Sequence, residues 1–369
     1  MKPSFKNAVF SLLTALLFLL FITRSSTAID YMKKGLELCL HNVIPSLFPL
    51  MVVSELISSG EGGSFWRKTL SPIARLVLGV GAESSVALLL GALCGFPVGT
   101  RVLCDAYDKG RITKKELERS LCFCNNSGVG FVISAVGASL FGNISLGAIF
   151  FACSLLSAFT VGIAQRLIFG SVASDHSPSQ YQCPPPRPFT ERITIAVRSS
   201  ALSMLTVCAF VVFFSSLVGC IGAILRSFGI NREIMAAVFC LFELSSGISA
   251  AAKLSSTHAV ILTAAALSWS GLSVHFQIMT VASDRKIRFA PYFISKAIQS
   301  LLSAATAAIL LRFIPLSDDV FNNNTASALP SSLVSGVFVG MALVFVSIFT
   351  IFIDKIRKKP CKKSNRKFF

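Results

Sequence analysis

Two short polar breaks interrupt long apolar runs, and they constrain the fold of this chain more than any other feature. The first lies at Asn125–Gly128 and follows Phe123, and the second lies at 245–247 and follows Phe242; both read Phe-x-x-(Asn/Ser)-Ser-Gly. Lipid cannot hydrogen-bond a broken backbone, so a polar break at membrane depth must face protein or a water-filled cavity. Corresponding interrupted segments in two halves of a membrane protein indicate a substrate site.

The composition is that of a membrane protein. Of the 369 residues, 53% are hydrophobic and only 14% are charged, well below the quarter or so usual in soluble domains. The formal net charge is +17, and the basic residues cluster in loops beside the apolar runs, as the positive-inside rule predicts. We therefore predict an all-α, multi-pass integral membrane protein whose partner is the lipid bilayer, with no nucleic-acid partner.

We expect about seven or eight transmembrane helices, two re-entrant helical hairpins and broken helices. Residues 7–23 resemble either a cleaved signal peptide or an uncleaved first helix, and both readings stay open. A Pro-rich linker divides the chain into two gate-like halves. The expected parts are a signal-anchor-like helix over 1–35, a first half over 36–169, the linker over 170–190, a second half over 191–354 and a basic inner tail over 355–369.

Two Gly-rich kinks suggest the hairpins, one at the centre of 84–108 and one near Gly271 in 257–282. As a hairpin, each arm would have about 10–12 residues and reach roughly 15–18 Å, about half of a hydrocarbon core that is about 30 Å thick. We favour this arrangement over a kinked span, because two glycines flanking Pro97 suit a tight turn. Whether the hairpins enter from the same or opposite faces stays open, because 232–252 could cross fully or reach halfway.

The kinks and breaks supply the candidate binding groups. A hairpin tip presents the free N–H groups of its second arm, which suit an anion, and Asn and Ser side chains add directional hydrogen bonds. Packing between helices is the competing interpretation, since Gly, Ser and Asn also line tight contacts. The candidate substrate-binding residues are Gly95, Pro97, Gly99, Thr100, Arg101, Asn125, Asn126, Ser127, Gly128, Ser245, Ser246, Ser270, Gly271 and Ser273.

Ionisable and polar side chains near these segments could couple transport to an ion. An intramembrane Arg is expensive, so Arg101 either binds a substrate carboxylate or pairs with Asp105 one turn on. Glu243 and His275, with Gln277 beside them, are candidates for proton or ion coupling, and a satisfied buried side chain is the alternative for each. Enzyme motifs and metal-ligand spacings are missing, so we expect neither catalysis nor a metal or cofactor.

Several motifs resemble the YlbJ/SpoVV sporulation integral membrane proteins, which carry nucleoside-recognition gate domains akin to those of concentrative nucleoside transporters. They are the stretches 91–99, 109–119 and 123–128, together with 44–49 and 271–275. The resemblance implies a carrier of a small organic anion, dipicolinate, moved toward the forespore. It implies the outer forespore membrane or the cell membrane as location. A nucleoside-type carrier and a structural or assembly protein of the spore envelope are the alternatives, and the oligomeric state stays open, a homo-oligomer included.

Overall fold

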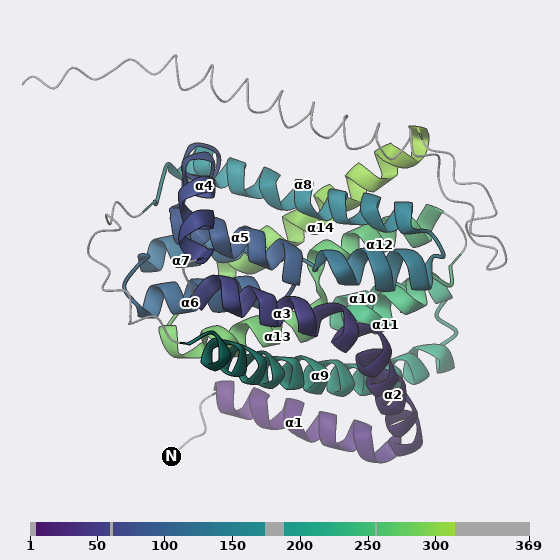
Figure 1. Cartoon of the computed structure of the whole chain (residues 1–369). Helices are drawn as coiled ribbons and strands as arrows, with labels where there is room; N and C mark the ends of the chain where they lie inside the picture. Colours follow the sequence, from purple (N-terminus) through teal and green to yellow (C-terminus); the bar gives the residue numbers. More distant parts are fainter. Residues whose placement is uncertain (1–4, 60–61, 174–187, 255–256, 314–369) are drawn as a thin grey trace, which may run out of the picture. The chain divides into compact units, whose positions relative to one another are not determined.

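The computed structural model describes residues 5–59, 62–173, 188–254 and 257–313, and they are almost entirely helical (Figure 1). These ranges contain no β-strand, so the predicted all-α class is confirmed. Five helices in them are long and apolar enough to cross a membrane, and up to six if a bent pair counts as one. Most of the predicted linker, the part of the predicted second half from residue 314 onward and the predicted basic tail lie outside the described residues.

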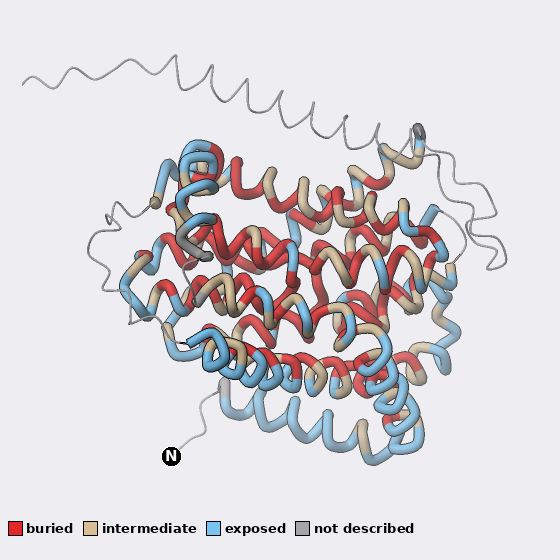
Figure 2. Tube along the Cα trace, in the orientation of Figure 1, coloured by how far each residue is buried: buried red, intermediate tan, exposed pale blue. Residues whose placement is uncertain are grey.

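The chain begins with helices at the edge of the bundle. Helix α1 (Phe5–Thr23) exposes apolar side chains all round, and Figure 2 shows it exposed along its length. Next come α2 (Ser25–Leu38), the π-helical turn η1 (Cys39–Val43) and α3 (Ile44–Ser59), which form one candidate span, longer than the sequence suggested because it starts before residue 36. Apolar residues exposed on outer helices are expected where lipid, rather than water, is the neighbour.

The first half contains a hairpin followed by a broken helix. Helix α4 (Gly62–Val77) bends by 97° into α5, and α5 then folds back against α6, so that a Cβ on Gly91 would lie 3.4 Å from the Cα of Gly99. The chain then leaves helical structure at 125–128, which we name break 1. The elements are α5 (Ala82–Cys94), α6 (Val98–Asp108), α7 (Lys114–Cys124), the π-helix η2 (Phe131–Leu140) and α8 (Ile144–Phe169).

The second half has the same order of parts. After the long helix α9, helix α10 folds back against α11, and a Cβ on Gly247 would lie 2.5 Å from the Cα of Cys240. Helices α12 and α13 are then interrupted at Ser270, which we name break 2. The elements are α9 (Phe189–Ser227), α10 (Arg232–Phe242), α11 (Leu244–Ala251), α12 (Thr257–Trp269), α13 (Gly271–Ala282), the 3-10 turn η4 (Ser283–Arg285) and α14 (Ala290–Phe313).

The second hairpin therefore lies elsewhere than the sequence predicted. The predicted segment 257–282 does not turn back; Thr257–Arg285 runs as one candidate span with a local kink. At this kink Ser270 and Gly271 adopt positive φ angles of 84° and 78°, and helix resumes at once. The reversal occurs instead at Glu243, within the segment 232–252 that the sequence left ambiguous. A break in an apolar run is visible in sequence, but the angle across it depends on what the two arms pack against.

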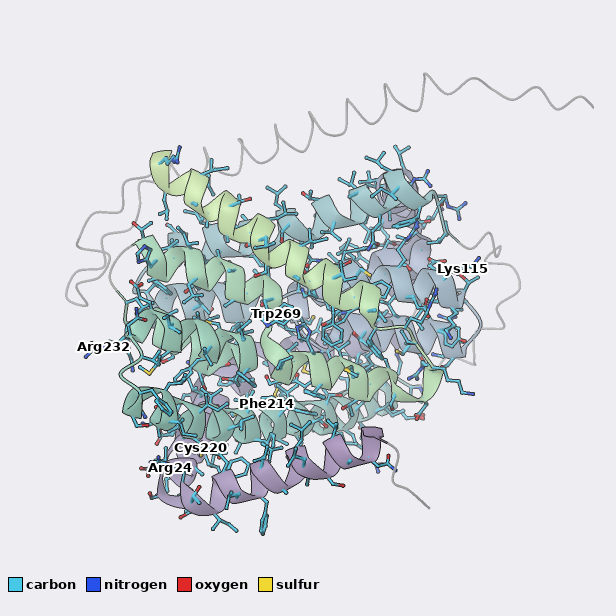
Figure 3. All side chains as sticks on the ribbon, turned by 180° about the vertical axis from the view of Figure 1, so that it is seen from behind. Arg24, Lys115, Phe214, Cys220, Arg232 and Trp269 are labelled. Atoms are coloured by element: carbon cyan, nitrogen blue, oxygen red, sulfur yellow. The ribbon has the colours of Figure 1, made fainter. Side chains whose placement is uncertain are left out.

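The two hairpins open at opposite ends of the bundle. Asp108, at the end of α6, pairs with Arg285, and Lys114 Nζ donates to the carbonyl of Lys286 at 2.6 Å. Glu233, at the start of α10, contacts His258 at 2.9 Å. Because 258 and 285 lie at opposite ends of one span, the first hairpin opens at the Arg285 end and the second at the His258 end. Figure 3 shows Lys115 and Arg232 at opposite ends accordingly.

Basic residues gather at one end of the bundle. Because Thr257–Arg285 runs as one candidate span, the basic run 285–288 at its end meets the basic stretch 109–119 through the contacts of Asp108 with Arg285 and of Glu118 with Arg288. Both basic clusters thus share one end of an inverted repeat.

Candidate functional site

Each hairpin tip packs against the helix break of its own half. A Cβ on Gly95, at the first tip, would lie 2.9 Å from the backbone nitrogen of Gly128 in break 1. A Cβ on Gly271, at break 2, would lie 3.0 Å from the nitrogen of Leu244 at the second tip. Such contacts exclude a side chain at either glycine. The backbone polar groups of each hairpin tip therefore lie next to the backbone polar groups of the break in the same half.

Hydrogen bonds join the two halves at the same depth. The Ser127 hydroxyl donates to the carbonyl of Leu267, near the end of α12, at 3.0 Å. On the other side, the hydroxyls of Ser157 on α8 and Ser268 on α12 lie 3.4 Å apart. Carbonyls freed at a helix break need partners inside a membrane. The side chains of one half therefore satisfy backbone groups of the other.

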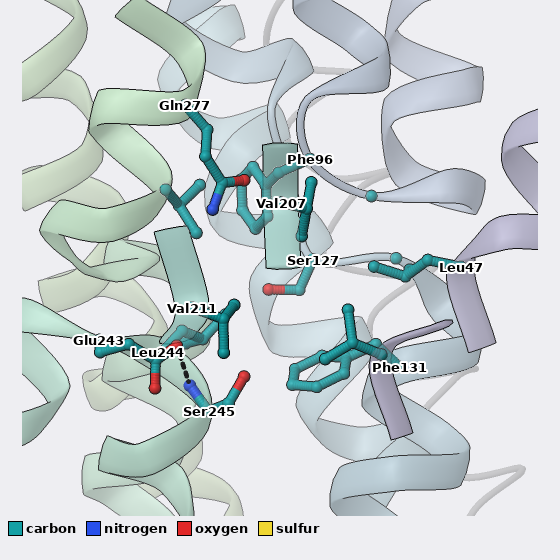
Figure 4. A pocket seen from close by; sticks show the side chains of 14 residues that line it. Leu47, Phe96, Ser127, Phe131, Val207, Val211, Glu243, Leu244, Ser245 and Gln277 are labelled. Carbon is teal, nitrogen blue, oxygen red and sulfur yellow. Dashed lines mark hydrogen bonds between the residues drawn. The ribbon is translucent and has the colours of Figure 1, made fainter. Parts of the chain in front are cut away.

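A cavity of about 40 Å³ lies between the two tips, break 1 and α13 (Figure 4). At about 10–15 Å³ for each water molecule, it has room for roughly three waters. Its wall is apolar except for a few polar groups at the tips, break 1 and α13. It is lined by Val43, Leu47, Gly95, Phe96, Ser127, Gly128, Phe131, Val207, Val211, Glu243, Leu244, Ser245, Val274 and Gln277.

The two tips differ in their electrostatics. Glu243, 1% exposed, caps α11: its carboxylate accepts the N–H of Ser245 at 3.0 Å and that of Ser246 at 2.5 Å. The first turn of α6 has no such acid, and Pro97 at its N-cap position makes no side-chain capping bond. An N-terminal helix end carries partial positive charge. The partial positive charge at the N-terminal end of α11 is thus already compensated by a carboxylate, whereas that at the N-terminal end of α6 is not.

Six of the predicted site residues line the cavity, and they come from both halves. Gln277 is notable because its side-chain Nε2 atom is buried without a hydrogen-bond partner among the described residues. In Figure 4 the Gln277 amide points toward the cavity. The six are Gly95, Ser127, Gly128, Glu243, Ser245 and Gln277.

Other predicted residues support the site from behind. The Thr100 hydroxyl donates to Asn125 Oδ1 at 2.7 Å, and the Asn125 amide donates to the Leu121 carbonyl, so both side chains tie α6 to the end of α7. Asn126 donates to the Phe123 carbonyl, while its Oδ1 is buried without a partner in the described ranges. Ser246 meets Ser215 of α9 at 2.9 Å. These contacts hold the broken backbone in place.

The remaining predicted residues also lie outside the cavity wall. Pro97 and Gly99 belong to the first tip and to α6, and a Cβ on Gly99 would lie 2.4 Å from the Cys124 carbonyl oxygen. The hydroxyls of Ser270 and Ser273 at break 2 are fully buried, without partners among the described residues. These residues pack behind the residues that line the cavity.

Arg101 occupies neither of the two positions expected for it. Its guanidinium hydrogen-bonds the Ser199 and Ser203 hydroxyls of α9 and lies 3.9 Å from a Glu55 carboxylate oxygen. Asp105, the other expected partner, instead pairs with Lys109 at 2.6 Å. Arg101 therefore fastens the first hairpin to α3 and α9.

His275 is likewise held away from the cavity, in an aromatic cluster. Its Nδ1 lies 2.7 Å from the Tyr292 hydroxyl of α14, and its ring lies edge-on to Trp269 with centroids 4.5 Å apart. The Nε2 atom has no partner in the described part of the chain.

Sequence reasoning missed two kinds of residue at or near the cavity. Apolar wall residues such as Phe96, Val207 and Val211 carry no sequence signal in a chain rich in such side chains. Lys296 on α14 did carry one, because a lysine in the middle of an apolar span is rare and usually functional. Lys296 is fully buried behind Phe96.

No group of three or more metal-ligating side chains occurs among the described residues.

Long apolar helices, two helical hairpins opening at opposite ends, and a cavity lined by both tips and break 1 define a multi-pass integral membrane protein. The chain is 24% identical over 374 residues to the sporulation integral membrane protein YlbJ of Bacillus subtilis (strain 168), covering 90% of this chain and 91% of that protein. This similarity supports the YlbJ-like family that the motifs indicated. No protein-family model matches the chain. No solved structure matches it.

Proposed function

We propose that this protein is a sporulation membrane transporter of a small organic anion, with dipicolinate as the favoured substrate. The observation that carries the proposal is the convergence of both hairpin tips and break 1 on one cavity, with break 2 packed against the second tip. The sporulation role follows the name of the Bacillus relative. Dipicolinate follows the family resemblance of the motifs.

The chemistry of the cavity suits a flat anion. The N-terminal end of α6 provides partial positive charge without a built-in acid, so it is the better position for a substrate carboxylate. The Phe96 ring and the valine and leucine side chains of the wall suit the faces of an aromatic ring. Ser127 and Gln277 would supply directional hydrogen bonds. We assign these roles to binding rather than catalysis.

The inverted hairpins suit alternating access. We propose that they re-enter the bilayer from opposite faces, with the basic end at 109–119 and 285–288 on the inner side. A cavity with room for roughly three waters is smaller than a pyridine dicarboxylate. Each hairpin would therefore swing outward in turn to admit or release substrate, and its closing would bury the site.

One observation favours a nucleoside-type carrier as the second candidate. Glu243 places a carboxylate on the cavity wall, where it could accept hydrogen bonds from ribose hydroxyls. Its two oxygens already accept the N–H groups of Ser245 and Ser246, which leaves it fewer free lone pairs. For this reason we favour the anion.

Uptake by the purified full-length chain in proteoliposomes tests the proposal. We expect saturable uptake of labelled dipicolinate that competing nucleosides do not reduce. It should be lost in Ser127→Leu, which fills the cavity, and retained in Ser139→Leu, an exposed position on η2. Competition by nucleosides would favour the second candidate. Absence of uptake of either compound, with normal insertion, would favour a structural or assembly role.

A further inference from the structure

Lys296 places an ammonium group at the end of a broken helix. This side chain is 0% exposed and lies on α14. Its Nζ donates to the carbonyl oxygen of Asn125 at 2.8 Å and to Gln299 Oε1 at 3.1 Å. It also lies 5.6 Å from the centroid of the Phe96 ring at the first tip. The ammonium thus joins α14 to break 1 and to the first hairpin.

No carboxylate in the described ranges lies within ion-pair distance of Lys296. Its charge is met by neutral oxygens and by the C-terminal end of α7, where helix dipoles leave partial negative charge. Gln299 reinforces this end, since its amide donates to the Cys122 carbonyl at 2.5 Å. An intramembrane charge compensated only by dipoles indicates a functional role.

Broken helices of transporters use such oxygens to hold ions. Unwound carbonyls and the C-terminal ends of half-helices coordinate coupling cations at the midplane, and a lysine ammonium is a compact cation of fixed position. Break 2 differs: in α12, which leads to it, the carbonyls of Ala264 and Ala265 accept the hydroxyls of Ser303 and Ser300, which are neutral. Of the two breaks, only break 1 has an ammonium group against its carbonyl oxygen among the described residues.

We propose that Lys296 is an internal, tethered cation that occupies the ion position of break 1. The carrier then needs no monovalent metal ion at this break, and the first hairpin and α7 keep their geometry without one. Removing the side chain would expose the Asn125 and Gln299 oxygens to a small cation from solution. The inference rests on the proposed function only for its transport consequence, because the ion position can be tested without a substrate.

Thermal stability of the full-length protein in detergent provides the first test. The wild-type Tm should be the same in choline, sodium and ethylammonium chlorides at equal concentration. Lys296→Ala should have a lower Tm than the wild type in choline chloride. Sodium should raise the Tm of this variant, and so should ethylammonium, which resembles the end of the lysine side chain. Ser303→Ala, a buried polar position on the same helix, is the matched control: its Tm should not respond to the cation.

The outcomes decide between a tethered cation and ordinary packing. A Lys296→Ala Tm that equals the wild-type value in choline, or that no small cation raises, overturns the proposal, as does specific stabilisation of the wild type by sodium. Should the variant unfold during purification, preparing it in ethylammonium keeps the test open. If the folded variant is recovered in ethylammonium and unfolds when the amine is removed, the proposal is supported. If the folded variant is not recovered in ethylammonium either, the result counts against the proposal.

Uptake provides the second test. Wild-type dipicolinate uptake should be unchanged when choline replaces sodium, whereas Lys296→Ala should fall by roughly tenfold or more and regain activity in ethylammonium. Strict sodium dependence of the wild type would contradict the tethered cation. If the wild type transports no dipicolinate at all, the proposed function fails while the Tm experiment still decides the role of Lys296.

Discussion

Three glycine-to-alanine substitutions give a graded test of the hairpin packing. An added Cβ would lie 1.9 Å from the Cys124 carbonyl oxygen at Gly91, 2.4 Å from the same oxygen at Gly99 and 3.0 Å from the Ser46 oxygen at Gly130. All three neighbours are backbone atoms, so no flexible side chain can move aside. Relative to an ordinary contact of 3.4 Å, the elements must separate by about 1.5, 1.0 and 0.4 Å, respectively.

These separations set the expected losses of stability. A gap of about 0.5–1 Å already removes a quarter to a half of the dispersion energy of the atoms that face it, and overpacking typically costs about 1–3 kcal/mol. We therefore expect Gly91→Ala to lose about 3 kcal/mol or more and Gly99→Ala about 2 kcal/mol. Gly130→Ala should change stability by less than about 1 kcal/mol, because the better helix propensity of alanine offsets a small clash.

The assay is the Tm and the yield of folded protein for the three variants, purified in the same detergent. The order of stability should be Gly130→Ala, then Gly99→Ala, then Gly91→Ala. Equal Tm values for Gly91→Ala and Gly130→Ala would refute the close approach of the first hairpin to the end of α7. The substitution is identical in each variant, so only the backbone distance distinguishes them.

Other predictions address binding, electrostatics and orientation. Gln277→Leu should reduce dipicolinate uptake with little loss of Tm, since its amide nitrogen has no protein partner in the described ranges; a Tm loss as large as that of Gly91→Ala would mean that the residue is structural. The hydrogen bond from Arg285 lowers the pKa of Asp108, so their pair should stabilise the protein above the ordinary aspartate pKa and lose its effect as pH falls through the lowered value. Because Asp108 is half exposed, Asp108→Asn should lower the Tm only slightly at neutral pH and not at pH well below that pKa; a larger effect in acid would contradict this sign. Cysteines replacing Lys115 and Lys253, both exposed, should react with impermeant reagents from opposite sides of the membrane, and labelling from one side would disprove the inverted arrangement.

The repeated motifs pair differently by residue type and by structural role. By residue type, the kink at Gly95 resembles that at Gly271, and the break at Ser127 resembles that at Ser246. In the structure Gly95 and Glu243 are the hairpin tips, whereas Ser127 and Ser270 lie at the helix breaks. Both halves therefore run hairpin, broken helix, long helix. Similar residues mark tips and breaks because both need small side chains and free backbone polar groups.

The class of protein and the approximate positions of the helix breaks follow from the sequence alone. Apolar runs long enough to span a bilayer, punctuated by Gly, Pro, Asn and Ser, have few foldable arrangements in a solvent that cannot hydrogen-bond the backbone. Contacts between helices set which breaks reverse the chain, how the two halves are inverted, and which side chains share the cavity. Arg101 hydrogen-bonds α9, Gln277 lines the cavity, and Lys296 hydrogen-bonds Asn125, which lies 171 positions away in the sequence. Local sequence fixes where a helix ends, but the direction in which the chain continues depends on contacts between segments far apart in the chain.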